Sequence, residues 1–464
     1  MKKFAPIAAV TVLALFVSCG GKNYFEMIKE PEKIFYQGKY KQAARMLLGQ
    51  VNKSGINQLI FQMECGYMLH AGGDYKNSNK VLLKAGKKAK VIPTSVSKQV
   101  KSLLTNESKT NYKGEDFEKV LIHMYLGINF LQLKKYDEAR VEFKKVNEEL
   151  TKIKSEGKAR YKQNLMAKYL TAVAYEIIGE KENDEDDLEY AYKEYEQIHT
   201  LAPGLKPVHT DLQRLAKRLK YADDYGKWTR KFGRKYLGNK DSGEIVLIFQ
   251  SGKSAIKKSR GKLMSDRGMN VAIHVSLNSI SMKQGVTAAA VLVALKTAHN
   301  PIPRYVSRTD RVRSVRMKIN NRIYRSYMLE DISSTAVQNL KDDYKKLKQK
   351  VAASIVVKAV ASIAAGIAAK QIAKAAGAGG FSGLIGTLAG AGTGAALFSS
   401  MGPDLRCWHT LPAKLHMARA TLRPGKYKVT LEFVGYNGTI LDKTTYPVTV
   451  EKGKKVFLNE RSLY

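Results

Sequence analysis

Cysteine and tryptophan are scarce in this chain of 464 residues, which has three copies of one and two of the other. No Cys-x-x-Cys pair occurs, and this excludes a zinc ribbon and a thioredoxin-type redox motif. The eight histidines form no His-Glu-x-x-His motif and show no close metal-binding spacing, so we predict no metal site. Acidic residues are also few, 41 against 79 lysines and arginines, which leaves a formal net charge of +38.

Motifs for catalysis are missing as well. The Ser-Gly-Lys-Ser run at residues 251–254 follows a predicted strand, but a phosphate-binding loop needs a second glycine where Leu247 stands. No Gly-x-Ser-x-Gly elbow occurs. We therefore predict no catalytic residue, no cofactor and no enzymatic activity, with an envelope glycan hydrolase as the enzymatic alternative.

The N-terminus has the pattern of an export signal. Lys2 and Lys3 form a short positive region, and residues 4–17 are almost purely apolar. The sequence Leu-Phe-Val-Ser then leads directly into Cys19. This resembles the lipobox of bacterial lipoproteins, although Phe16 stands where leucine is usual.

The lipobox resemblance implies where the mature protein starts and where it works. Residues 1–18 would be a signal peptide, and Cys19 would carry palmitate-type acyl chains that anchor the protein in a membrane. Gly20 and Gly21 follow the cysteine in place of the aspartate that often marks inner-membrane retention, which favours an outer-membrane protein facing the periplasm. The alternatives are cleavage by the ordinary signal peptidase and an uncleaved membrane anchor.

Export changes what the net charge of +38 indicates. In the cytoplasm such a charge would suggest nucleic acid, but in the envelope the abundant polyanions are phospholipids, lipopolysaccharide and cell-wall polymers. We expect either attraction to these polymers or plain solvated lysines, and no nucleic-acid partner. With Cys19 lipidated, Cys65 and Cys407 remain, and their apolar contexts favour two buried free thiols over a disulfide.

Residues 19–235 show helical spacing of apolar residues and an internal repeat. Tyr40, Tyr75 and Tyr136 each follow a helix break and have a small residue three positions further on. This pattern resembles the second helix of the tetratricopeptide repeat. Tyr40 and Tyr75 stand 35 positions apart, near the usual period of about 34, whereas Tyr136 is out of register. We expect an irregular helical solenoid that binds a protein partner through its concave face and these tyrosines, with a generic helical bundle as the alternative.

Beyond residue 243 the pattern predicts an α+β arrangement. A β-rich region at 243–330, a long helix with a glycine-rich apolar segment at 331–403, and a C-terminal β-sandwich-like module at 404–464 follow in order. Predicted strands lie at residues 244–250, 270–277, 311–319, 322–328, 415–422, 426–434, 444–450 and 455–458. We expect the strands on either side of the long helix to share a sheet or sandwich, with that helix as an excursion between them.

The glycine-rich segment has no charged residue from 375 to 403, and Gly386, Gly390 and Gly394 stand four apart in it. On a helix these glycines line one face and allow close helix packing. The uncharged length would span a bilayer, but glycine and alanine supply little transfer energy. Three interpretations remain: a helical hairpin packed on the protein, an oligomer or partner contact, and membrane insertion.

A dense polar and aromatic group follows at residues 404–412. Asp404 and Arg406 are predicted to form a charge pair near Trp408. The group is either a structural latch between the apolar excursion and the β module, or a contact for a ligand or partner. Its Asp-x-Arg-x-Trp-x-x-Leu-Pro pattern resembles uncharacterised bacterial envelope lipoproteins with tetratricopeptide-like N-terminal halves, although Cys407 stands where serine is common in them.

These features together predict a lipid-anchored scaffold or binding protein of the cell envelope. It would engage a protein partner, anionic envelope polymers, or both. The alternative function is a membrane-active or oligomerising pore component that uses the glycine-rich segment.

Overall fold

The computed structural model describes residues 23–89, 111–155, 164–233, 241–282, 286–375 and 402–464. Cys19 and the three predicted packing glycines, Gly386, Gly390 and Gly394, lie outside this part of the chain.

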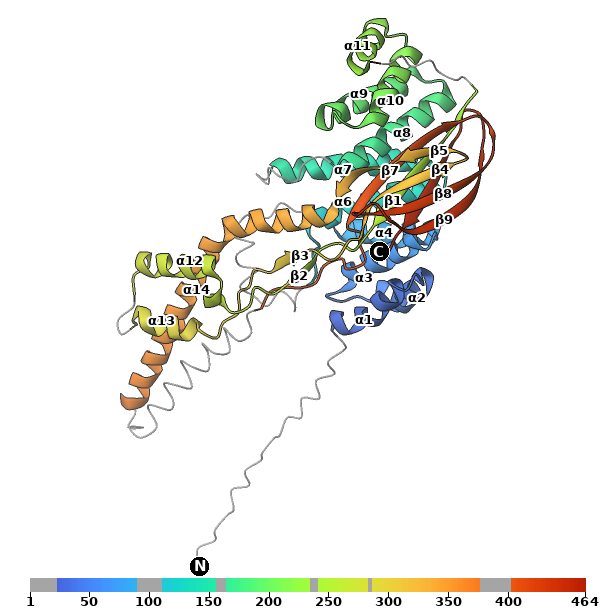
Figure 1. Cartoon of the computed structure of the whole chain (residues 1–464). Coiled ribbons are helices and arrows are strands. Elements are labelled where there is room, and N and C mark those ends of the chain that lie inside the picture. The colour runs from blue at the N-terminus through green and yellow to red at the C-terminus, as the bar shows by residue number, and fades with distance from the viewer. Residues whose placement is uncertain (1–22, 90–110, 156–163, 234–240, 283–285, 376–401) are drawn as a thin grey trace, which may run out of the picture.

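The N-terminal part is an array of helices that pack in sequence order (Figure 1). Their bounds are α1 Tyr24–Phe35, α2 Tyr40–Val51, α3 Gln58–Ala71, α4 Tyr75–Lys88, α6 Asp116–Gln132, α7 Tyr136–Ser155, α8 Leu165–Glu182, α9 Glu185–Leu201, α10 Lys206–Arg218 and α11 Ala222–Phe232. Each helix contacts the next one along the array, as in tetratricopeptide-like solenoids. The predicted helical-repeat half is therefore confirmed.

The three repeat tyrosines are the first residues of α2, α4 and α7. The small residues three positions later, Ala43, Ser78 and Ala139, are completely buried. At these positions the second helix of a pair approaches the first, and Ser78 Oγ donates to the Gly66 carbonyl at 2.7 Å. In the turn before Tyr136, Lys134 adopts the left-handed conformation at φ 58°. Gly73 adopts the same conformation in the turn before Tyr75, where glycine does so without strain.

Two four-stranded sheets form the C-terminal part. The strands are β1 Gly243–Ser251, β2 Ile256–Lys258, β3 Arg304–Val306, β4 Val312–Ile319, β5 Arg322–Arg325, β6 Tyr327–Asp331, β7 Lys414–Leu422, β8 Gly425–Gly435, β9 Ile440–Val450 and β10 Lys455–Arg461. The inner sheet has the order β10-β1-β7-β6, the outer sheet has the order β5-β4-β8-β9, and β2 pairs with β3. Strand β1 is parallel to β10 and antiparallel to β7.

Strands from both sides of the long helix thus share both sheets, as predicted, and the Asn320-Asn321 turn joins β4 to β5. The inner sheet is a central layer. On β1, Ile245, Leu247 and Phe249 face the outer sheet, whereas Val246 and Ile248 pack with the helical array. This two-sided cover explains why every residue of β1 is buried and why residues 245–249 at its centre are all apolar.

A helical arm projects from the rest of the molecule (Figure 1). It combines α14, Ile332–Ala375, which follows β6, with α12, Arg267–Ser279, and α13, Ala288–Leu295, which lie between β2 and β3. Helix α14 packs against α12 and α13 through a separate apolar cluster. A short 3₁₀ helix, η2, covers Leu263–Ser265 and precedes α12.

The prediction of a strand at residues 270–277 is wrong, because this segment is part of α12. Its β-branched residues suggested a strand, but the buried positions Met269, Ala272, Ile273 and Ser276 recur at helical spacing against α14. The Asp266 side chain caps the helix by accepting from the Met269 N–H at 3.1 Å. Tertiary packing and the cap therefore outweigh local β propensity.

Candidate functional site

Residues 404–411, which we call the crossing segment, run from the arm to β7 across the inner face of the helical array. Trp408 is only 1% exposed and packs edge-on against Tyr67 of α3 and Tyr125 of α6, at ring-centroid distances of 6.2 and 6.0 Å. The segment therefore covers the side of the array that α3 and α6 form.

Two buried carboxylates of the array hold the backbone of the crossing segment. Glu64 on α3 accepts from the His409 N–H at 2.6 Å, from the Thr410 N–H at 3.2 Å and from the Thr410 hydroxyl at 2.5 Å. Glu118 on α6 accepts from the Trp408 N–H at 2.7 Å. Burial and the neighbouring Glu115 carboxyl raise the pKa of Glu118 to about 7.

The predicted charge pair between Asp404 and Arg406 is present, at 2.7 Å. Arg406 also donates to the Ile56 carbonyl at 3.2 Å and to Asn57 Oδ1 at 2.8 Å, so it fastens the segment to the loop before α3. Burial favours the neutral form of Asp404, but its bond with Arg406 holds its pKa below the usual value. These contacts fasten the segment to the helical array, whereas the predicted latch joined the apolar excursion to the β module.

Cys407 and Cys65 are both buried free thiols, as predicted. The Cys407 Sγ accepts from the Lys257 N–H at 3.4 Å, and burial raises the pKa of Cys65 to about 12.

A buried polar network joins the array to β1 and β10. Tyr67 donates to Gln250 Oε1 at 2.9 Å, and Gln250 Nε2 faces His70 Nε2 at 2.8 Å. His70 Nδ1 lies 2.6 Å from Asn129 Oδ1. Since Gln250 can only donate from Nε2, these contacts assign a neutral His70 that carries its proton on Nδ1. Burial lowers the pKa of His70 to about 4.

An ion cluster joins the other end of the inner sheet to the array. Its cations are Arg214, Arg419 and Lys455, and its buried anions are Glu176, Asp211 and Glu244. Although burial favours the neutral carboxyl, Arg419 and Lys455 hold the pKa of Glu244 at about 2. Glu180, which is 35% exposed, also pairs with Arg214 and Lys455. The three cations therefore meet three buried carboxylates and one partly exposed carboxylate, so no charge of the cluster is without a partner.

The predicted partner-binding tyrosines contact the protein itself. Tyr40 donates to the Arg461 carbonyl at 3.4 Å, Tyr75 accepts from Asn459 Nδ2 at 3.4 Å, and Tyr136 is half-buried against the same core. Partner binding by these tyrosines or by the latch residues stays a prediction, and it would require this packing to open.

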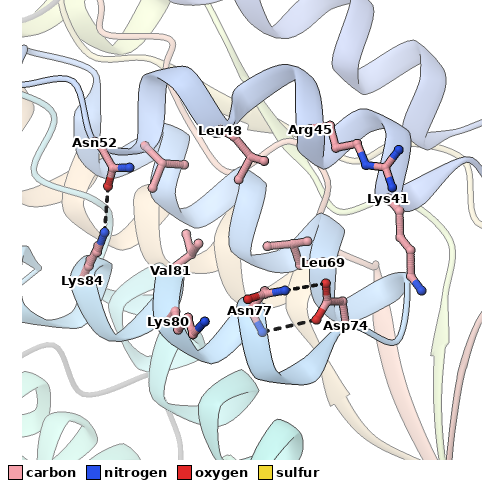
Figure 2. A pocket seen from close by; sticks show the side chains of 11 residues that line it. Lys41, Arg45, Leu48, Asn52, Leu69, Asp74, Asn77, Lys80, Val81 and Lys84 are labelled. Carbon is pink, nitrogen blue, oxygen red and sulfur yellow. Dashed lines mark hydrogen bonds between the residues drawn. The ribbon is translucent and has the colours of Figure 1, made fainter.

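A different cavity is open to solvent, on the side of α2 and α4 (Figure 2). This outer groove has a volume of about 460 Å³. Its lining includes Lys41, Arg45 and Leu48 on α2 with Lys80, Val81 and Lys84 on α4. The groove was not among the predicted sites, although the two cations on each helix stand four residues apart. The described residues contain no group of three or more His, Cys, Asp or Glu that could hold a metal ion.

No protein-family model and no curated protein matches the chain. Among solved structures, MamA is 15% identical, with 43% of this chain and 91% of MamA covered and a TM-score of 0.28. A putative Podosopora anserina kinesin light chain with nearly identical TPR-like repeats is 14% identical, over 45% of this chain and 93% of that chain, at a TM-score of 0.28. The Rap conjugation gene regulator of plasmid pLS20, solved with the Phr* peptide, is 12% identical over 82% and 76%, at a TM-score of 0.23.

Proposed function

We propose that this chain is a lipid-anchored scaffold of the bacterial cell envelope that holds a protein partner on the outer side of its helical array. The observation that carries the proposal is the filled inner face. Trp408, Glu64 and Glu118 are engaged in contacts within the chain, whereas a cavity between α2 and α4 is open to solvent.

Rigidity supports a scaffold role. The inner sheet contacts the array through the apolar core, the His70 network and the ion cluster. A partner that binds the outer helices would therefore meet a preformed surface and would pay little ordering entropy. The lipobox-like Cys19 would fix this surface at a membrane, and the net charge of +38 would draw it toward anionic envelope polymers.

The anchor is tested by metabolic labelling with an alkynyl fatty acid. We expect label on the full chain and none on Cys19→Ser, which should also leave the membrane fraction. Label that persists in Cys19→Ser would refute lipidation at this residue.

The partner is tested by lysine-reactive crosslinking in cells of the source organism followed by mass spectrometry. A fusion of residues 1–22 to an unrelated soluble domain serves as the control for anchoring alone. We expect one envelope protein to be recovered in near-stoichiometric amount with the full chain and not with the fusion. Identical recovery from both would refute the scaffold.

The arm favours a second candidate, a membrane-active role. Residues Leu347–Ala368 of α14 are long and apolar enough to cross a bilayer, with a mean hydropathy of 2.1, and only 39% of the most apolar window is buried. Val271, Val275 and Val357 are each more than half exposed on the arm.

Liposome flotation separates the two candidates. Under the scaffold proposal, protein without acyl chains stays in solution, and deleting residues 375–400 leaves it folded. Flotation of acyl-free protein that this deletion abolishes would favour the membrane-active candidate.

A further inference from the structure

The outer groove combines an apolar floor with a cationic rim. Val51, Leu69 and Val81 are buried beneath it, and Leu48 is 45% exposed at its edge. Figure 2 shows the side chains of α2 and α4 facing each other across this space.

Four cations surround the floor. Lys41 and Arg45 stand one helical turn apart on α2, and Lys80 and Lys84 are spaced in the same way on α4. Lys84 donates to Asn52 Oδ1 at 2.7 Å. Within the described part of the chain, no carboxylate forms a salt bridge with any of the four.

The single acidic residue of the lining, Asp74, offsets only one of these four charges. Asp74 caps α4, and its carboxylate accepts from the Asn77 N–H at 3.3 Å and from Asn77 Nδ2 at 2.9 Å. The groove therefore presents several uncompensated cations beside exposed apolar surface, which suits an anionic ligand that also has an apolar side chain.

We propose that the outer groove binds an acidic peptide segment of the partner protein, with an apolar side chain of that segment inserted beside Leu48. The concave shape argues for a peptide, because a flat bilayer surface would meet the rim cations without reaching Val81 on the floor. Both helices carry their lining residues at spacings of three and four, so the groove follows the helix axes and can accept an extended or helical segment. This inference rests on the proposed scaffold function and names the surface and the chemistry of its partner.

The test uses the full mature chain and a fluorescein-labelled peptide of glutamates around a central leucine, with binding followed by fluorescence anisotropy. The double variant Arg45→Glu, Lys80→Glu should weaken binding by at least about tenfold, because it turns attraction into repulsion on both rims. The matched control Lys206→Glu, Lys217→Glu removes the same net charge from α10 and should change binding less than about twofold. An equal loss in both variants would show attraction by net charge alone and would overturn the proposal.

A second pair of variants tests the apolar contact. Leu48→Ser should weaken the leucine peptide about fivefold or more and leave a peptide with a central serine unchanged. Leu83→Ser, on the exposed side of α4 outside the lining, is its control. Arg45, Leu48, Lys80 and Leu83 are all exposed, so these substitutions should not disturb the core. Circular dichroism checks that each variant is folded.

The remaining outcomes separate this inference from the scaffold proposal. If anionic phosphatidylglycerol vesicles bind in a way that depends on Arg45 and Lys80 whereas the peptide does not bind, the groove recognises lipid and the inference fails. If the crosslinked partner is recovered equally well with Arg45→Glu, Lys80→Glu, the groove inference fails and the scaffold stands. Failure of the wild type to recover a partner would overturn the scaffold itself.

Discussion

Replacing Arg419 by methionine should destabilise the whole molecule, because Arg419 is the centre of the ion cluster between β7 and the array. Its guanidinium donates to Asp211 Oδ1 at 2.8 Å and to Glu176 Oε1 at 3.1 Å, and it also bonds with Glu244. The side chains of Arg419, Glu176 and Asp211 are at most 6% exposed. Methionine fills similar volume, so the main effect is electrostatic.

The magnitude follows from the charge balance. Without Arg419, two cations, Arg214 and Lys455, face the same three buried carboxylates and the partly exposed Glu180. Removing one partner of a buried ion pair costs about 3–5 kcal/mol. Burial already raises the pKa of Asp211, so this carboxyl can take up a proton and relieve part of the excess charge, which places the expected loss near about 3 kcal/mol.

The assay is urea unfolding followed by circular dichroism and by the fluorescence of Trp228 and Trp408, the two tryptophans of the chain. Trp228 reports on α11 and Trp408 on the crossing segment, so a Trp228→Phe background isolates the second signal. Lys193→Ala is the control, because its pair with Glu189 is 56% and 38% exposed and is screened by solvent, so its loss should leave the unfolding free energy almost unchanged.

Two results would refute the reasoning about the ion cluster. One is an Arg419→Met unfolding free energy within about 0.5 kcal/mol of wild type, since surface changes commonly fall in that range. The other concerns Asp211→Asn, which should restore about 1 kcal/mol or more in the Arg419→Met background because it removes one uncompensated charge. Purely additive effects of the two substitutions would show that the residues are not coupled.

Three further predictions concern the inner face and the packing within the array. Trp408→Ala should lower the unfolding free energy by about 3–5 kcal/mol, because it leaves a cavity between α3 and α6; calorimetry showing an unchanged melting temperature would contradict this. His70 is neutral in the fold with a pKa of about 4, so the unfolded chain alone takes up this proton below pH 6.5, and the unfolding free energy should fall by about 3 kcal/mol toward pH 4 through this group. Urea titrations across this range should show a shallower decline in His70→Gln, and identical slopes would exclude His70 as the cause. Gly127→Ala would place a methyl group 2.4 Å from Phe143 Cε1 between α6 and α7, and should cost about 1–3 kcal/mol, whereas Gly49→Ala, with open space around it, is the control.

The helical repeats were predictable because their signal is local. Tyr40, Tyr75 and Tyr136 mark helix starts through the turn before them and the small residue after them, and both lie within a few positions in the sequence. The shared sheets were also predictable in outline, since the apolar run at β1 requires cover on both faces. Register and strand order depend on contacts over long sequence distances and cannot be read from composition.

The filled inner face was not predicted, because no local pattern says which distant segment covers a groove. One signal was present in α3, where every residue from Leu59 to His70 is buried, including Gln62 and Glu64. A solenoid helix with one free face would carry polar residues along that face and apolar residues along the other, at helical spacing. A buried polar residue such as Glu64 in an otherwise apolar helix needs hydrogen-bond partners. It can therefore indicate that another segment of the same chain covers the helix and donates its backbone N–H groups.

The pairing of β1 with β10 has a consequence for how the chain folds during its synthesis. Gln250 on β1 bonds with Arg461 on β10, 211 positions further along. During synthesis the repeat helices are complete long before that strand is available, and until then their tyrosine-rich inner side has no cover. The nascent chain therefore exposes apolar core residues of the array during most of its synthesis. Its maturation depends on being kept from premature contacts until β10 closes the sheet.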